Sequence, residues 1–493
     1  MKRLLALILV FSMIFCISAC KPEEEDNTDI VIKKENETLK IHCYSFTDLN
    51  PLLAVKDANM QMLRLMFESL IQCDNTQKPQ PQLAESYSVS GDALVWTLKL
   101  KKGIKWHDGT EFTAKDVVYS YNYVIDNVDS TAYAVNVSNI ESVNATSDYE
   151  VNFRLKVPQA NFVNLLEIPI VKAESGGPFE PVGTGPYVYK ETANKIVYLE
   201  ANPHWHGGDV STKNIHVKIL PDEETVTYAY VSKEIDVVSV NSGIDMGEYS
   251  SNSDNKIVDY PSNNFNYISV NTSAEPLSNR MFRKAIAHAI DKEAINSEVL
   301  LSHGSVANSC MNSGWWVYNP GITIYEYSKE KAIEVLDNVK KNMKLVPVRL
   351  MVNEDNEEKC KVAEMIKSNL EDCGITLNIE YVDWATFSER AYTGNYQMFL
   401  GSIKYSADIN PAYLVQNPSA ELQSLFSEMD VQTTEDGIKG KYFEIQAKMA
   451  TELGIIPLYF DASTVMYNKR IEGVLTPCRI NIFNGIQGLD LEA

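Results

Sequence analysis

The sequence contains few histidines and no familiar catalytic motif. Seven histidines are spread over 493 residues, and HExxH, GxSxG, CxxC, GxGxxG and a glycine-rich phosphate loop ending in Lys-Ser or Lys-Thr are all absent. His204 and His206 flank Trp205, but two histidines without a third partner are too few for a zinc site. We therefore expect a protein that is not an enzyme and needs no cofactor or metal.

Basic residues are also in short supply. Lysine and arginine number 44 against 66 acidic residues, which gives a net charge of −22. Because binding to nucleic acid depends on Lys and Arg contacts with phosphates, this balance argues against nucleic acid as a partner. It is compatible with a cationic or zwitterionic ligand, although a solvated acidic face is the commoner reason for such a composition.

Long apolar runs are absent, and the one short run lies at the amino terminus. Leu4–Ile17 carry no charge and follow Lys2 and Arg3. Fourteen residues are too few for a membrane-spanning helix, which needs about 20. The pattern is that of a secretory signal. Since no later stretch approaches 18 apolar residues, we expect no other segment to cross a membrane.

The four residues Ile17-Ser18-Ala19-Cys20 resemble the lipobox of bacterial lipoproteins. The resemblance implies that residues 1–19 are a removed signal and that Cys20 carries a diacylglyceryl anchor, on the outer face of the cytoplasmic membrane, extracellular or periplasmic. An ordinary cleaved signal with a chance cysteine is the alternative. Residues 21–38 hold ten charges and three aliphatic residues, so we expect residues 20–38 to form a flexible tether.

Six cysteines are left once Cys16 is removed and Cys20 is lipidated, and no pair has zinc or redox spacing. Residues 357–371 read as one helix, in which 13 residues would separate Cys360 from Cys373 by about 20 Å. A disulfide needs Cα atoms within roughly 7 Å, so this pair is excluded. Other disulfides and scattered free thiols are both left open.

What the sequence does contain is a regular alternation of strands and helices. A strand over 346–352, the helix over 357–371, a strand over 375–382, a helix from Asp383 to Arg390 and a strand over 396–402 predict a parallel sheet covered by helices. The fold class is therefore α/β. Ligands of such sheets lie beyond the carboxyl ends of the strands, which makes Gly401–Asp408 a candidate site or, alternatively, an ordinary loop.

Helix starts and one further strand can also be predicted. Val95–Lys101 alternate in period two, as a half-exposed strand does. Thr113 is expected to cap a helix with Asp116 at the third position, and Ser278 to cap the helix that carries Phe282 and Ile290.

Five stretches of the chain are distinctive when taken together. They are PQLAESYSVSGDALVWTLKLKKGIKWHDGTEFTAKDVVYSYNYVID (Pro81–Asp126), LNPLLAVKDANMQMLRLMFESLI (Leu49–Ile71), GTGPYVY (Gly183–Tyr189), ANPHWHG (Ala201–Gly207) and NYISVNTSAEPLSNRMFRKAIAHAIDKEAI (Asn266–Ile295). Together they resemble the extracellular solute-binding proteins of the peptide and nickel importer class. They follow the family's order from about residue 39 to 475, nearly the whole mature chain.

The resemblance implies a two-lobe clamshell of the periplasmic-binding-protein type II fold, with an α+β subdomain inserted in the first lobe. The implied first lobe is 39–265, its insert about 70–180, the second lobe 266–459, and the return to the first lobe 460–493. Such a receptor closes on a ligand and delivers it to the permease of an ABC importer. We expect it to act as a monomer.

For the family's oligopeptide and dipeptide binders, an aspartate of the second lobe pairs with the amino terminus of the peptide. SADINPAYL (Ser406–Leu414) resembles that stretch with Asp408 as its only acid, although the match needs a one-residue gap and lacks the usual upstream tryptophan. An Asx-turn before Pro411 is the alternative role for Asp408. The candidate ligand-binding residues around it are Gly401, Ser402 and Tyr405.

Trp315 and Trp316 lie in a loop rich in Gly, Ser and Asn, and such aromatic pairs either line a ligand pocket or fasten the loop to its own lobe. The favoured ligand is an oligopeptide; nickel chelates, haem and oligosaccharides are the rivals within the class. A lipid-anchored hydrolase or peptidase is the alternative from another class, and a signalling or adhesion lipoprotein with this fold is a third possibility.

Overall fold

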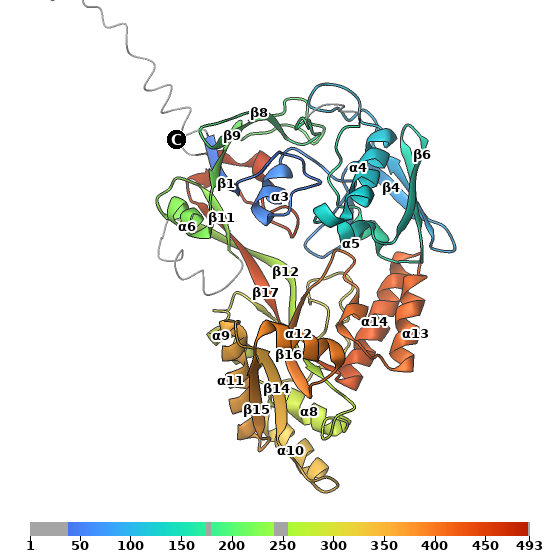
Figure 1. The fold of residues 1–493 in the computed structure, drawn as a ribbon, viewed down its shortest axis with the longest axis vertical. Helices are drawn as coiled ribbons and strands as arrows, with labels where there is room; N and C mark the ends of the chain where they lie inside the picture. Colours follow the sequence, from blue (N-terminus) through green and yellow to red (C-terminus); the bar gives the residue numbers. More distant parts are fainter. Residues whose placement is uncertain (1–37, 174–178, 241–254, 492–493) are drawn as a thin grey trace, which may run out of the picture.

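The computed structural model describes residues 38–173, 179–240 and 255–491. The predicted signal (residues 1–19), the lipid anchor at Cys20 and nearly all of the tether lie outside these ranges. The described chain forms two lobes, one above the other in Figure 1. No helix in these ranges is long and apolar enough to cross a membrane.

The first lobe is built on a four-stranded sheet in the order β1-β10-β9-β8. Its strands and neighbouring helices are β1 (Thr38–Tyr44), β8 (Tyr187–Ala193), β9 (Ile196–Ala201), β10 (Asn214–Leu220), α3 (Asp57–Leu63) and α6 (Glu223–Val231). β1 runs parallel to β10, and the other pairs are antiparallel. Alternate residues of β1 are buried, because one face of the sheet packs on the core of the lobe.

A second sheet of the first lobe comes from the segment predicted as an insert, and it has the order β4-β5-β7-β6. Its elements are β4 (Ala84–Val89), β5 (Val95–Leu100), β6 (Ile140–Ser147), β7 (Glu150–Leu155), α4 (Ala114–Asp126) and α5 (Ala134–Val137), with the hairpin β2 (Ile71–Cys73) and β3 (Pro79–Pro81) beside it. β5 confirms the predicted period-two strand. The cap of α4 is also confirmed, since the Thr113 N–H donates to the Asp116 carboxylate over 2.8 Å.

The second lobe contains the predicted parallel sheet. β14 (Val348–Asn353) pairs in parallel with β15 (Leu377–Val382) and with β16 (Met398–Lys404). The intervening helices are α11 (Glu357–Asp372) and α12 (Trp384–Thr393), and Asp383 caps α12 through the Thr386 N–H. The other helices are α8 (Arg280–Ala289), α9 (Lys292–Glu298), α10 (Lys329–Lys340), α13 (Ala420–Asp430) and α14 (Glu435–Glu452).

One predicted helix start in this lobe is wrong by a residue. Asn279, and not Ser278, caps α8: its side-chain oxygen accepts hydrogen bonds from the N–H groups of Met281 and Phe282. The Ser278 hydroxyl donates instead to the carboxylate of Glu275. The Ser278 side chain therefore does not cap the helix. The Asn279 side chain, one position later, reaches the unpaired N–H groups of the first helical turn instead.

The sheet of the second lobe is covered on both faces, and each face has its own core. Leu350 of β14 and Leu400 of β16 contribute to one hydrophobic core, whereas their chain neighbours Met351 and Phe399 contribute to the other. This is the alternation expected of a strand that is buried on both sides.

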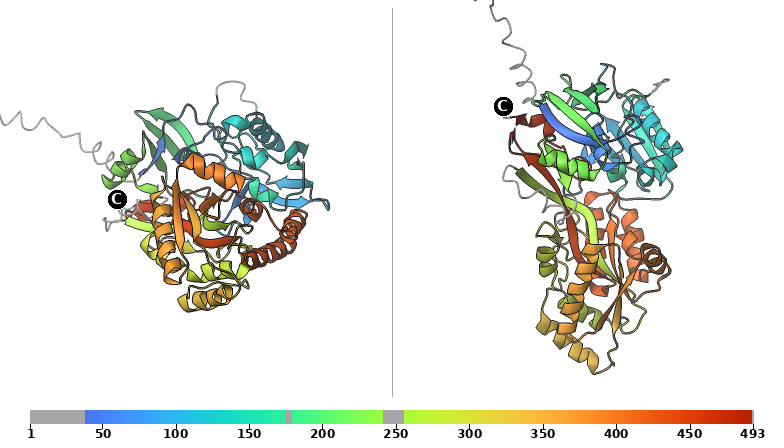
Figure 2. Two further views of the ribbon diagram at one scale, coloured as in Figure 1. Left: turned by 60° about the horizontal axis from the view of Figure 1, so that its bottom comes forward. Right: turned by 60° about the vertical axis from the view of Figure 1, so that its left-hand side comes forward.

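Two long strands join the lobes, as Figures 1 and 2 show. They are β12 (Asn255–Val270) and β17 (Ile455–Asn468), which pair antiparallel, while β11 (Val237–Val240) extends the sheet at the first lobe. The register of the β12–β17 pair shifts between Pro261 and Phe265, midway along both strands. Such an irregularity breaks the ladder and bends it, so this is the natural hinge between the lobes. The predicted boundaries near 266 and 460 fall inside these two strands.

The six cysteines in the described ranges are free thiols. Cys360 is partly exposed on α11; the others are buried, namely Cys43, Cys73, Cys310, Cys373 and Cys478. Burial raises the pKa of the Cys43 and Cys310 thiols to about 12.

Candidate functional site

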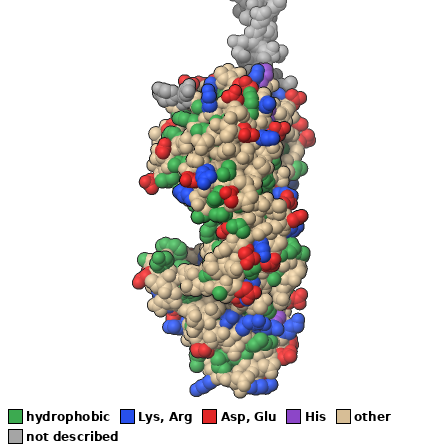
Figure 3. Space-filling model, turned by 90° about the vertical axis from the view of Figure 1, so that its right-hand side faces the viewer, with side chains coloured by type: hydrophobic (Ala, Val, Ile, Leu, Met, Phe, Trp, Pro, Cys, Tyr) green, Lys and Arg blue, Asp and Glu red, His purple; other side chains and the backbone are tan. Residues whose placement is uncertain are grey.

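A cavity of about 420 Å³ lies between the first lobe and the hinge, and Figure 3 shows the notch between the two lobes on the molecular surface. The first lobe contributes its side chains from β1, α3, α6 and the C-terminal segment, and the hinge strands and the end of β16 contribute the opposite wall. The charged and titratable side chains that line it are His42, Asp57, Glu223, Lys404, Asp461 and Arg479. Its size is within the usual range for small-molecule sites.

Asp461 is the carboxylate of this cavity that is most removed from water. It is on β17, where its two oxygens accept hydrogen bonds from the side-chain amides of Asn264 and, over 2.6 Å, of Asn266. Burial is the main reason why the pKa of Asp461 is raised to about 6; the Asn264 amide and the Lys359 ammonium act to lower this pKa, and the Glu358 carboxylate acts to raise it. By contrast, Asp57 and Glu223 are exposed side chains at the rim.

Lys404 is at the end of β16 and projects to the same side of the sheet. Its Cα is the register partner of Asn264 on β12, and directly opposed residues of an antiparallel pair share a face. Among the described residues it has no hydrogen-bond or ion-pair partner for its ammonium, and its side chain is exposed.

Two further side chains that line the cavity belong to the first lobe. The guanidinium of Arg479 forms an ion pair with the buried carboxylate of Glu167, which also accepts from the Cys73 N–H over 3.0 Å. Burial lowers the pKa of His42 to about 4, so this imidazole is neutral at physiological pH. Its Nδ1 atom is buried and has no hydrogen-bond partner within the described ranges.

A second, smaller cavity of about 160 Å³ lies between the inserted subdomain and α14. Three aromatic side chains, Tyr87, Trp96 and Trp316, are among those that line it. The ion pair between Lys78 and Glu435 (2.6 Å) links the two lobes beside it. This cavity is too small for more than a side chain or a few water molecules.

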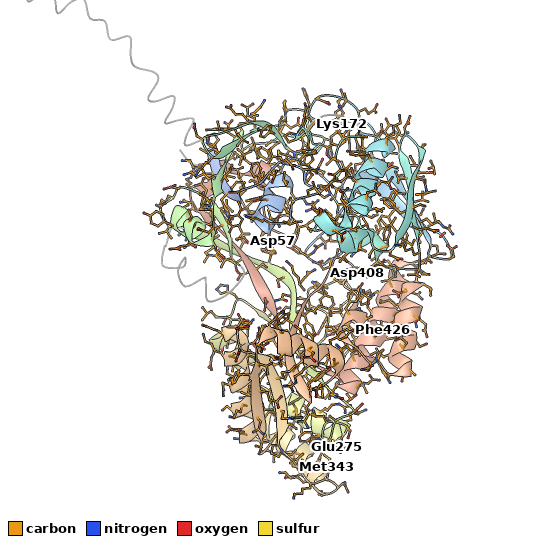
Figure 4. All side chains as sticks on the ribbon, in the orientation of Figure 1. Asp57, Lys172, Glu275, Met343, Asp408 and Phe426 are labelled. Carbon is orange, nitrogen blue, oxygen red and sulfur yellow. The ribbon has the colours of Figure 1, made fainter. Side chains whose placement is uncertain are left out.

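Asp408, the predicted amino-terminal anchor, is a buried residue that lines neither of these cavities. Its carboxylate accepts hydrogen bonds from the Ser406 hydroxyl, from the Tyr413 hydroxyl (3.2 Å) and from the Gln159 amide (3.1 Å). Gln159 belongs to the first lobe, so Asp408 is a contact point between the lobes. Figure 4 shows Asp57 and Asp408 on the two sides of the boundary between the lobes.

The neighbours of Asp408 take part in the same contact. The Asn161 amide of the first lobe donates to the Asp408 carbonyl oxygen over 3.1 Å, and the Asn164 amide donates to the Ala407 carbonyl oxygen over the same distance. The backbone N–H of Trp316 in the second lobe donates to the Thr76 carbonyl oxygen over 2.9 Å. The described lobes are therefore in direct contact along the side that carries Asp408.

The other predicted site residues on β16 and beyond are mainly packed within the second lobe. A Cβ on Gly401 would lie 2.6 Å from the Phe399 ring, so the glycine makes room for a neighbouring ring. Ser402 is exposed and accepts from the Lys359 ammonium over 2.7 Å. Tyr405 is buried and donates to the Cys310 carbonyl oxygen over 2.9 Å.

The two predicted tryptophans lie in different surroundings. Trp315 is buried in the second lobe, where its ring meets Tyr405 and Phe460 edge to face at centroid distances of 5.5 and 5.4 Å. Trp316 reaches across to the first lobe and lines the smaller cavity. Trp315 therefore fastens the loop to its own lobe, while Trp316 is at the boundary between the lobes.

The histidine pair of the first lobe does not build a metal site. Nε2 of His206 lies 2.8 Å from the buried Glu68 carboxylate, and the Trp205 indole also donates to that carboxylate over 3.3 Å. In residues 38–173, 179–240 and 255–491, no group of three or more His, Cys, Asp or Glu side chains could hold a metal ion.

The fold and cleft agree with what sequence comparison finds. Residues 78–420 match the family model of bacterial extracellular solute-binding proteins, family 5. The chain belongs to this family. It is 24% identical over 510 residues to the oligopeptide-binding protein AppA of Bacillus subtilis, covering 95% of this chain and 92% of that protein. It is 25% identical to the heme-binding protein A of Haemophilus influenzae, covering 83% and 84%.

A solved structure shares the fold over most of this chain. HbpA2 from Haemophilus parasuis superposes with a TM-score of 0.80 at 22% identity, covering 92% of this chain and 100% of that one. This family consists of extracellular substrate-binding proteins and not of enzymes. The two-lobe fold class expected from the sequence is confirmed.

Sequence reasoning missed the charged residues that line the cavity, among them Lys404 and Asp461. Lys404 is next to the predicted site residue Tyr405 but gives no signal of its own. Asp461 had a detectable signal, because it is the one acid that directly follows the apolar run Ile455–Phe460. A carboxylate at the end of a buried strand is costly unless it is hydrogen-bonded or has a function.

Proposed function

We propose that this family 5 protein captures a peptide in the larger cavity and delivers it to the permease of an ABC importer. The observation that carries this proposal is the cavity between the first lobe and the hinge strands, whose lining combines carboxylates with the ammonium of Lys404, which has no partner among the described residues. A peptide is a zwitterion with one charge of each sign at its ends. Both lobes contribute to the lining, so a bound ligand would stabilise the closed arrangement.

The charges favour a peptide over haem, the ligand in the name of the Haemophilus influenzae relative. Three carboxylates (Asp57, Glu223 and Asp461) line the cavity against two cations, and one of these, Arg479, is already paired with Glu167. The propionates of haem would add negative charge to this surplus, whereas the ammonium of a peptide offsets it. The Bacillus subtilis relative is named for oligopeptides, which agrees with this choice.

Asp408 is a second candidate for binding the ammonium of the peptide. Its carboxylate is occupied by the Gln159 amide of the first lobe, so a ligand would have to displace that amide as the lobes separate. We also propose that the receptor acts as a monomer held at the outer face of the membrane by a lipid on Cys20.

Peptide capture predicts that the mature protein, purified without denaturation, retains peptides in intact form. Native mass spectrometry is expected to show bound masses that are replaced when an excess of synthetic peptide is added. The peptide mass should be unchanged after prolonged incubation, because the site holds the ligand without cleaving it. Retention of a haem chromophore with no peptide, or release of shortened peptides, would refute the proposal in favour of the haem or the hydrolase alternative.

A further inference from the structure

Three side chains form a row across the hinge strands on the cavity side of the sheet. The Asn264 amide of β12 donates to Asp461 of β17, and Asn264 is the register partner of Lys404 on β16. All three residues line the larger cavity. Neighbouring strands are about 4.8 Å apart, so the strands that carry the acid and the base are separated by about 10 Å.

The two ends of this row have unused binding capacity. A carboxylate can accept about four hydrogen bonds, and Asp461 accepts one on each oxygen from the two asparagine amides. Lys404 has three N–H donors and no partner for them within the described ranges. The cavity is the space into which both groups can reach.

We propose that Asp461 binds the amino terminus and Lys404 the carboxyl terminus of a short unblocked peptide, with Asn264 between them. This assignment rests on the proposed function. An extended peptide rises by about 3.3–3.6 Å per residue, so a separation of about 10 Å corresponds to roughly three residues. A cavity of about 420 Å³ suits a ligand of that size.

Desolvation explains why Asp461 is the stronger of the two anchors. A largely buried carboxylate is costly to keep ionised, even with the Lys359 ammonium nearby, and a ligand ammonium lowers that cost. Asp57 and Glu223 are exposed and stay hydrated without a ligand, so an ammonium gains less at either of them. Lys404 is exposed too, and its contribution should be smaller than that of Asp461.

The test is calorimetry with trialanine, its N-acetylated form and its C-terminal amide. Asp461→Asn is expected to weaken binding of trialanine at least about 30-fold. The same change should have little effect on the N-acetylated peptide, which already binds poorly to the unaltered protein. Lys404→Met is expected to weaken trialanine roughly 2- to 5-fold and to leave the C-terminal amide unaffected. Pentaalanine should bind more weakly than trialanine.

Matched variants separate this assignment from its rivals. Lys344→Met removes an exposed lysine next to Met343 at the far tip of the second lobe (Figure 4) and should leave trialanine binding unchanged. Asp408→Asn tests the rival anchor: because Asp408 contacts Gln159 of the first lobe, this variant should change the binding of trialanine and of its N-acetylated form to the same extent. Equal losses for free and acetylated peptides in Asp461→Asn, or a selective loss in Asp408→Asn, overturn the assignment but keep peptide capture. Pentaalanine that binds as tightly as trialanine overturns it likewise. Failure of the unaltered protein to bind any of the peptides overturns both.

The pH dependence of affinity gives an independent measurement. With a pKa of about 6, Asp461 is largely ionised at pH 7 and about one-tenth ionised at pH 5, so trialanine should bind about tenfold more weakly at pH 5. The termini of the peptide keep their charges over this range, and His42 stays neutral because its pKa is about 4. The titratable and charged groups that face Asp461 or line its cavity are Asp57, Glu223, Glu358, Lys359, Lys404 and Arg479.

Asp461→Asn should remove most of this pH dependence, because asparagine does not titrate. Any pH dependence that is left would come from the other groups, which the variant retains. The N-acetylated peptide should show a flat profile with either protein. If the tenfold loss persists in Asp461→Asn, another group titrates and the assignment of the ammonium to Asp461 is wrong.

Discussion

Gly183→Ala is expected to prevent stable folding of the first lobe. A Cβ at this position would lie 1.8 Å from the Met66 carbonyl oxygen and 2.6 Å from its carbonyl carbon. Both atoms belong to the backbone in a fully buried segment, so no side-chain rotation can relieve the clash. We expect a loss of more than about 4 kcal/mol in the free energy of unfolding, with a fall in melting temperature of roughly 10 °C or no soluble protein.

Gly440→Ala is the matched control for this change. Gly440 is an exposed residue of α14, and a Cβ built there meets no atom within 4 Å. Alanine is favoured over glycine inside a helix by about 0.5–1 kcal/mol, so this variant should be slightly more stable than the unaltered protein. Thermal unfolding followed by circular dichroism measures both effects. A melting temperature of Gly183→Ala within a few degrees of the original would show that the 65–66 segment can move aside.

Cys20→Ser is expected to abolish lipid attachment. Only the thiol of Cys20 can form the thioether that the lipobox resemblance implies, and a serine hydroxyl cannot replace it. In cells grown with an alkyne-bearing fatty acid, label on the protein should fall to background in the variant. Because each buried CH₂ contributes about 0.8 kcal/mol to membrane affinity, loss of the acyl chains should also release the mature protein from washed membranes.

Cys360→Ser is the control for the anchor, since Cys360 is the partly exposed thiol of the second lobe. It should keep both the label and the membrane association. Label that persists in Cys20→Ser would place the lipid on another residue. Absence of label from both the unaltered protein and Cys20→Ser would favour an ordinary cleaved signal.

Local patterns were sufficient to predict the parallel part of the second lobe's sheet and the helices that connect its strands. The strands β14, β15 and β16 and the helices between them were predicted within about two residues at most boundaries, because apolar periodicity and caps such as Asp383 act over a few neighbouring residues. The same is true of Thr113 and Asp116 at the start of α4. Ser278 was misassigned because Asn279 beside it is an equally good cap, and only the geometry of the turn decides between them.

The candidate site could not be predicted in the same way, because it depends on register between distant strands. Asn264, Lys404 and Asp461 are far apart in the sequence, and only the pairing of β12 with β16 and β17 brings them into one row. A shift of one residue would turn Lys404 to the opposite face of the sheet. The contact between Gln159 and Asp408 is equally hidden, since it joins two lobes that pack through their surfaces.

The buried thiols have a consequence for the order of events during export. An extracellular family member meets oxidants while still unfolded, when its cysteines have ordinary reactivity and six of them could pair in 15 ways. In the folded chain burial raises the pKa of Cys43 and Cys310 to about 12, which lowers their reactive thiolate fraction by roughly a thousandfold. Folding that precedes oxidation therefore protects these two thiols from forming disulfides.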